Sequence, residues 1–209
     1  MSDDETQRIT DPQSMRALAH PLRLQLMDLL ALEAELTATQ CAERTGESVA
    51  SCSFHLRMLA KYGYVRPGEQ RGREKPWRLV SRSRTIGPDV DDPESVREAG
   101  AFAQIIVDRE AARLHKAITR AAELGPAWLD SMTIRTSSVW MTHEELDVMI
   151  ERLGEFQDEL KERFSGRRDD PALRPDGARV VHFLGALSPD VDVPAHTSTA
   201  DHADAHDQS

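Results

Sequence analysis

The stretch from Ser48 to Gly63 limits the fold of this 209-residue chain more than any other part of it. Apolar residues recur there at spacings of three and four positions, which predicts one buried stripe along a helix. The residues of this stripe are Val49, Cys52, Leu56 and Leu59. Ser48 is a preferred N-cap residue, and a glycine such as Gly63 can adopt the positive φ at which helices commonly end. The sequence therefore predicts a helix over 48–62, with its more polar side turned away from the core.

The segments on either side of this helix predict a recurrent arrangement. Apolar residues at helical spacing fill 14–32, and Pro21 divides them into two short helices, because proline disfavours a helical conformation at the preceding residue. Residues 37–46 predict a short helix capped by Thr37 or Thr39 and closed by Gly46. After the long helix, the β-rich runs "YVRPG" and "KPWRLV" flank a turn centred on Gly72 and predict a two-stranded ribbon. This order of elements is that of a winged helix-turn-helix.

The net charge of −10 hides a strong asymmetry between the two halves of the chain. Residues 13–86 contain 12 Lys and Arg against 7 Asp and Glu, whereas residues 87–209 contain 13 against 25. A basic first part and an acidic second part predict that only the first part binds a polyanion such as nucleic acid.

Three stretches carry a resemblance to a known family: "ALAHPLRLQLMDLL", "TATQCAERTGESVASCSFHLRMLAKYGYV" and "RGREKPWRLV". They resemble the winged-helix domain of ArsR-type bacterial transcriptional regulators over about residues 15–80. The resemblance implies a homodimeric regulator, most often a repressor, that reads an inverted repeat in double-stranded DNA. It maps the recognition helix onto 48–62 and the wing onto 66–77. The remainder is similar to longer members that carry an α/β domain after the winged helix.

The predicted DNA contacts come from the recognition helix and the wing. Small hydroxyl residues in the first turn would let the helix enter a major groove about 12 Å wide, and a basic ribbon tip would lie along the phosphate backbone. The residues expected to contact DNA are Ser48, Ala50, Ser51, Ser53, Phe54, His55, Arg57, Lys61, Arg71, Arg73 and Lys75. For His55 a structural hydrogen bond is an equal alternative to a DNA contact.

The rest of the chain predicts a fold that is mainly α with small β. We expect a disordered N-terminus over 1–12, the winged helix-turn-helix domain over 13–86, a dimerisation or effector domain over 93–188 and a disordered tail over 189–209. The third of these begins with a long amphipathic helix over 96–124, which we expect to supply the chief dimer contacts. A strand over 131–141, a helix opened by the capping box of Thr142 and Glu145, and a strand over 178–187 complete an α-β-α-β order.

Two other functions remain open for the second half. Trp128, Trp140 and Phe183 are candidate residues of a pocket for a small-molecule effector, although such residues more often form a core. Alternatively, the acidic half is a module that recruits another protein. The acidic N-terminus is not a signal peptide, and no apolar run reaches the length of a membrane helix, so we expect a cytoplasmic protein.

Metal and catalytic sites are not expected. Metal-sensing ArsR members carry a C-x-C pair where this chain has Cys41 alone, and Asp108 with His115 does not match their other ligand pattern. Cys41 and Cys52 fall where the core requires small apolar side chains. His196, His202 and His206 lie in the tail without a preorganised geometry. "GESVA" lacks the last glycine of a nucleophile elbow, and "THEELD" lacks the second histidine of a zinc protease, so we expect neither an enzyme nor a cofactor.

Overall fold

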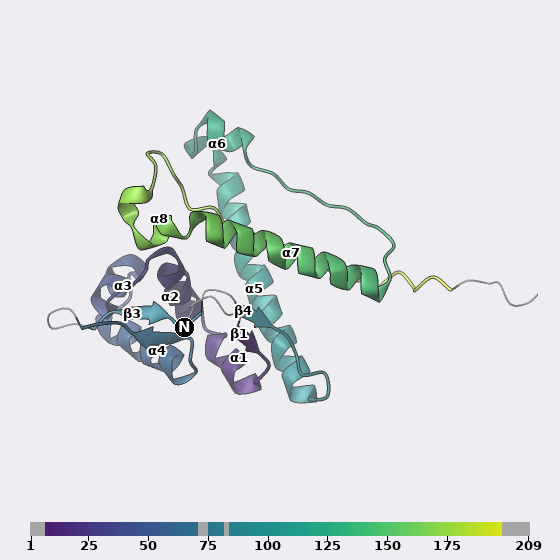
Figure 1. Ribbon diagram of the computed structural model, residues 1–209, viewed down its shortest axis with the longest axis horizontal. Coiled ribbons are helices and arrows are strands. Elements are labelled where there is room, and N and C mark those ends of the chain that lie inside the picture. Colours follow the sequence, from purple (N-terminus) through teal and green to yellow (C-terminus); the bar gives the residue numbers. More distant parts are fainter. Residues whose placement is uncertain (1–6, 71–74, 82–83, 198–209) are drawn as a thin grey trace, which may run out of the picture.

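The computed structural model describes residues 7–70, 75–81 and 84–197 (Figure 1). The elements are β1 (Gln7–Ile9), α1 (Pro12–Leu18), α2 (Pro21–Leu32), α3 (Ala38–Thr45), α4 (Val49–Lys61), β2 (Val65–Pro67), β3 (Trp77–Leu79), β4 (Arg84–Ile86), α5 (Pro93–Thr119), η1 (Ala121–Glu123), α6 (Pro126–Asp130), α7 (His143–Phe164), α8 (Gly166–Asp169) and η2 (Pro171–Leu173). The expected class, mainly α with small β, is confirmed.

The first two helices begin at capped prolines. The carboxylate of Asp11 accepts a hydrogen bond from the Ser14 amide at 2.7 Å and opens α1. The Nδ1 atom of His20 accepts from the Leu22 amide at 3.2 Å and opens α2, in which Pro21 is the first residue. Proline suits this position because its missing N–H would have no partner in the helix. The predicted bend at 19–21 is thereby confirmed.

The helix-turn-helix has the predicted boundaries. Thr37 forms a capping box with Gln40 at the start of α3, and Gly46 ends that helix at a φ of 77°. Ser48 accepts from the Ser51 amide and caps α4, after which Gly63 turns the chain at a φ of 74°. The predicted buried stripe is wrong at one residue, because the Val49 side chain is 45% exposed. It is the first residue of α4, directly after the turn that follows α3.

The wing contains the expected antiparallel pair. Val65 lies opposite Leu79 and Pro67 opposite Trp77 in the β2–β3 ladder. The main chain of Leu36 exchanges two hydrogen bonds with Trp77, which fixes the base of the ribbon to the α2–α3 connection. The turn predicted around Gly72 lies outside the described residues.

A parallel pair of short strands joins the N-terminus to the linker. β1 runs beside β4, with Ile9 opposite Ile86. The buried hydroxyl of Ser95 donates to the Thr10 carbonyl at 2.7 Å and accepts from the Asp89 amide at 2.9 Å. The prediction of disorder over 1–12 is therefore wrong for its second half, because Gln7–Ile9 has a strand partner and Pro12 already lies in α1.

One hydrophobic core extends from Ile9 to Phe102. Tyr64 is completely buried in it, and its hydroxyl donates to the Ser14 carbonyl at 2.7 Å. Ala99 and Phe102 bring the first half of α5 into the same core, so the packing continues past the predicted domain boundary at 86. Among the described residues after 106, none is buried.

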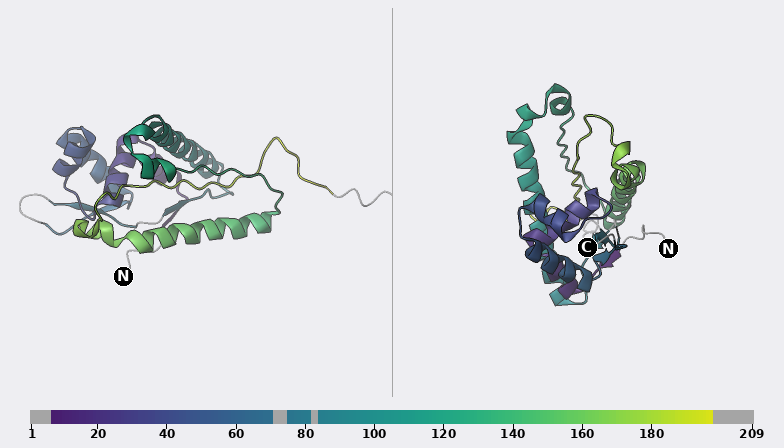
Figure 2. Two further views of the ribbon diagram at one scale, coloured as in Figure 1. Left: turned by 90° about the horizontal axis from the view of Figure 1, so that it is seen from above. Right: turned by 90° about the vertical axis from the view of Figure 1, so that its left-hand side faces the viewer.

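The second half differs most from its prediction. The long helix and the Thr142–Glu145 capping box are present, but no strand forms between residues 93 and 197. The strands expected over 131–141 and 178–187 are extended chain without a ladder, because a β-rich pattern becomes a strand only where a partner strand lies beside it. Both views in Figure 2 show these segments running between α5 and α7. None of the helices in the described part of the chain has the length and apolar character of a membrane span.

Candidate nucleic-acid interface

The solvent-facing side of α4 presents one row of side chains. Cys52, Leu56 and Leu59 are completely buried on one side of the helix. Apart from Val49 at its start, the exposed residues of α4 follow a spacing of four, three and four positions, which places them on one opposite stripe. They are Ala50, Phe54, Arg57 and Lys61. Four of the residues that we predicted as DNA contacts therefore share a face.

The start of α4 adds polar groups next to this row. Ser48 is exposed, and its hydroxyl accepts from the Ser51 amide at 3.1 Å. Ser51 and Ser53 are half-buried. Because the amides of a first helical turn point outward and carry partial positive charge, this end of α4 suits a phosphate group.

His55 lies at the border of α4 and contacts the protein itself. Its ring centroid is 4.4 Å from that of His20, and its Nδ1 atom is 3.5 Å from a guanidinium nitrogen of Arg23. The Phe54 ring meets its edge at 5.2 Å. Burial lowers the pKa of His55, and the neighbouring His20 and Arg23 lower it further. These contacts favour the structural alternative for His55.

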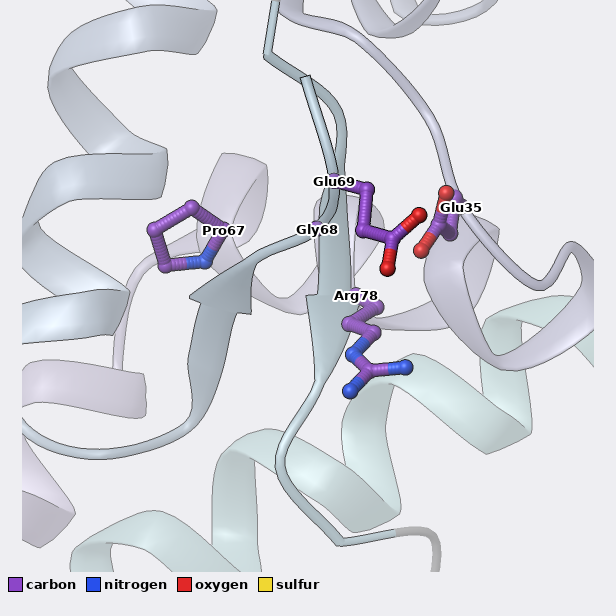
Figure 3. A pocket seen from close by; sticks show the side chains of 5 residues that line it. All are labelled: Glu35, Pro67, Gly68, Glu69 and Arg78. Atoms are coloured by element: carbon purple, nitrogen blue, oxygen red, sulfur yellow. The ribbon is translucent and has the colours of Figure 1, made fainter. Parts of the chain in front are cut away.

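The described part of the wing extends the basic surface only in part. Lys75 is exposed beside the ribbon, whereas the predicted contacts Arg71 and Arg73 lie outside the described residues. A cavity of about 410 Å³ lies at the base of the wing (Figure 3). Glu35, Pro67, Gly68, Glu69 and Arg78 line it. Its two carboxylates and one guanidinium make it unsuited to an apolar ligand.

The two cysteines belong to the core, as predicted. Cys41 and Cys52 are free thiols with no exposed surface. The Thr45 hydroxyl lies 3.6 Å from the Cys52 sulfur. Burial raises the pKa of the Cys41 thiol to about 11. A thiol that is buried and protonated is a poor nucleophile and a poor metal ligand.

The three aromatic residues proposed for an effector pocket have separate neighbours. The Arg179 guanidinium lies 6.0 Å from the Trp128 ring, and Phe183 packs edge-on against Phe156 at 5.3 Å. Trp140 is 74% exposed. The single chain does not gather these rings around one space.

Charged residues that sequence reasoning missed fix α5 against the helix-turn-helix. Asp28 on α2 accepts from Arg109 at 3.2 Å and also from Arg113, and both arginines bind Glu110. On α1, Arg16 binds Glu94 and Glu98 at 2.9 and 3.0 Å. The partners are far apart in the sequence, so no local pattern could have indicated these pairs.

Comparison with known proteins agrees with this geometry. Residues 18–66 match a family described as a helix-turn-helix domain. They contain α2, α3 and α4 together with the first two residues of β2. No curated protein matches the chain.

Solved structures of regulators are similar over part of the chain. Reduced HlyU from Vibrio cholerae is 26% identical, covers 32% of this chain and 68% of its own, and has a TM-score of 0.28. The homodimeric winged helix-turn-helix DNA-binding domain of "a possible ArsR-family transcriptional regulator" from Mycobacterium bovis is 26% identical, with coverages of 46% and 76% and a TM-score of 0.32. The S. aureus MepR–DNA complex is 17% identical, with coverages of 53% and 85% and a TM-score of 0.30. Since these TM-scores are low, the placement of α4 rests on its own geometry and on the matched domain.

Proposed function

We propose that this helix-turn-helix protein is an ArsR-type transcriptional regulator that binds DNA as a homodimer, with α4 in the major groove and the wing along the backbone. The observation that carries the proposal is the row of Ala50, Phe54, Arg57 and Lys61 on a helix whose other side is locked in the core. A rigid helix that presents small, aromatic and basic side chains in line has the geometry of a recognition helix.

The charge distribution supports the same orientation. The first part of the chain has an excess of basic residues, and the acidic residues concentrate after residue 86. The basic part is therefore expected to approach DNA while the acidic part is repelled from it. Lys75 beside the wing and Lys61 at the end of α4 are both exposed and suit phosphate contacts.

A homodimer would present two α4 helices to two half-sites about one helical turn apart. The exposed apolar residues on the second half of α5 suit a helix–helix contact between two copies. These residues are Val107, Leu114 and Ile118, which are 50%, 43% and 49% exposed. Repression of a promoter that overlaps the inverted repeat is the outcome that we propose for such binding.

Fluorescence anisotropy tests the proposal with DNA from upstream of the gene for this protein, a scrambled duplex of equal length and several salt concentrations. Specific binding should be tighter than scrambled binding by about 10³ or more, with a steep salt dependence. Phe54→Ala and Ala50→Asp should reduce this ratio, because both change the exposed row of α4. Absence of binding to any duplex at low salt would contradict a DNA-binding function.

A further inference from the structure

The second half of the chain leaves an apolar surface that its own fold does not cover. Two extended segments, Thr133–Met141 and Arg179–Leu187, expose nine large apolar side chains by 41% to 74%. These residues are Ile134, Val139, Trp140, Met141, Val180, Val181, Phe183, Leu184 and Leu187. Their exposed areas sum to about 1,000 Å², and exposed apolar surface of this extent marks an interaction site. A standard interface buries about 800 Å² on each partner, so the two segments together expose enough apolar surface to contribute to a dimer contact.

The two segments run in the same direction, and side chains near their ends approach each other. At one end the Arg179 guanidinium lies 6.0 Å from the Trp128 ring, and at the other end the rings of Trp140 and His196 are 6.4 Å apart. α7 connects the segments (Figure 1). Its Phe156 ring packs against the ring of Phe183 in the second segment. This is the arrangement of a strand–helix–strand unit whose strands have no ladder.

The main chain of the first segment is available for pairing. Within the described part of the chain, Thr133–Met141 takes part in no main-chain hydrogen bond with another strand. It contains no proline, and its only charged residue is Arg135. An extended, weakly charged and apolar edge of this kind pairs readily with another strand.

Charge identifies the partner as a second copy of this chain. α7 carries eight Asp and Glu residues and three Lys and Arg residues, so a basic partner would be drawn to α7. Thr133–Met141 offers such a partner no negative charge, and with Arg135 as its single charge it matches a surface that is also apolar and weakly charged. Its own copy is such a surface, and two identical patches meet about a twofold axis.

We propose that Thr133–Met141 pairs antiparallel with the same segment of a second copy, with the twofold axis at Ser137. This register pairs all nine residues and places Ile134 of each copy opposite Trp140 of the other. An aromatic side chain opposite a β-branched one is a favourable cross-strand pair. The register also places Arg135 opposite Val139, so that the two arginines do not face each other. The interface requires no DNA and therefore goes beyond the proposed function.

Cross-linking of the full-length chain tests the register. In a Ser137→Cys variant, the two new thiols face each other across the axis at a separation that a disulfide can bridge. In the matched control, Ser138→Cys, the new thiol faces residue 136 of the other copy. Both native cysteines are completely buried, so only the introduced cysteine should form an intermolecular disulfide. Under a mild oxidant, Ser137→Cys should form a covalent dimer at least about ten times faster than Ser138→Cys, since geometry decides disulfide formation. Equal rates, or no dimer from either variant, would overturn the proposal.

Sedimentation equilibrium of full-length variants provides a second test. Trp140→Asp should weaken association at least about tenfold, because it places a charge opposite the apolar side chain of Ile134 in the other copy. Val191→Asp is the matched control, because Val191 is 92% exposed and lies outside the paired segment. Circular dichroism should show the same helix content for both variants. Association constants that are equal for the two variants would rule out the strand interface.

Anisotropy on DNA is a separate measurement, so loss of DNA binding with intact cross-linking would count against the proposed function alone.

Discussion

The imidazole rings of His20 and His55 lie 4.4 Å apart and join the start of α2 to the middle of α4. His20 also caps α2, since its Nδ1 atom accepts from the Leu22 amide. An imidazole can accept through Nδ1 only while that nitrogen has no proton. The same ring thus fixes the bend before α2 and the border of the recognition helix that we propose, provided that it is neutral.

Acidification should therefore destabilise the protein. Burial lowers the pKa of His20 and His55 below the ordinary value of 6.5; nearby Arg23 acts in the same direction, and Glu47 opposes it. Because the unfolded chain binds more protons, the stabilisation is present above about pH 6.5 and is lost as the pH falls through the lowered values. Urea unfolding should give a lower midpoint at about pH 5.5 than at about pH 7.5. A His20→Asn, His55→Gln variant should lose part of this difference, and an unchanged difference would contradict a role for the ring pair.

Arg57 and Lys61 should contribute to DNA affinity without sequence preference. Replacing both by alanine should reduce the slope of log K against log salt by about 1.8, since each phosphate contact contributes about 0.9. The Arg97→Ala, Lys116→Ala variant removes the same charge from exposed positions on α5 and should leave the slope unchanged. The salt titration that tests the function provides the measurement. Relaxed sequence preference with an unchanged slope would mean that Arg57 and Lys61 contact bases instead.

The wing arginines give a parallel prediction. Arg71→Ala with Arg73→Ala should weaken binding to the specific and the scrambled duplex by similar factors and flatten the salt dependence. Competition titrations with both duplexes would measure the two factors. If only the specific complex weakens, the wing reads sequence and our assignment of it to the backbone is wrong.

The cysteines should be inert in the folded protein. Cys41 and Cys52 have no exposed surface, and the pKa of Cys41 is raised to about 11. An alkylating reagent at neutral pH should label neither thiol until denaturant is added, because the thiolate is the reactive form. Cys41→Ser with Cys52→Ser should lower the free energy of unfolding by about 1–3 kcal/mol through buried hydroxyls. Rapid labelling of the native protein would contradict a core role.

Asp28 should matter more for stability than an ordinary surface acid. It lies between Arg109 and Arg113, and its side chain is only 28% exposed. Asp28→Asn should lower the free energy of unfolding by about 1–2 kcal/mol, because two half-buried guanidinium groups would keep Glu110 but lose the other of their two shared counter-ions. Asp158→Asn breaks a pair of which the acid is 62% exposed, and it should cost less than about 0.5 kcal/mol. Equal effects in urea unfolding would show that the Asp28 contacts add nothing beyond a surface pair.

Local signals in the sequence were sufficient for the helix-turn-helix. The caps at Ser48 and Thr37, the bend before Pro21 and the turns at Gly46 and Gly63 each depend on residues a few positions apart, and each is present in the structure. The row of Ala50, Phe54, Arg57 and Lys61 follows from the same helical period. Local periodicity thus predicted both the elements and the exposed face of α4.

Contacts between distant segments could not be predicted in the same way. β1 pairs with β4 across most of the first domain, and Asp28 lies 85 positions from Arg113. The segments at 131–141 and 178–187 show the opposite error, since their β-rich pattern was recognised but no partner strand accompanies them. A propensity describes what one segment tolerates, and a sheet also requires a second segment.

The Ser95 hydroxyl and the β1–β4 pair have a consequence for the order in which the protein is made. The chain is synthesised from its N-terminus at about 5–20 residues per second, and domains begin to fold as they leave the ribosome. Ile9 can pair with Ile86, and Thr10 can bind Ser95, only after those later residues have been synthesised. The core is complete only once Phe102 is present. The residues of α4, the recognition helix that we propose, are therefore all synthesised well before the surrounding core can form. A nascent chain halted near residue 86 should remain protease-sensitive, whereas one released beyond about residue 106 should resist digestion.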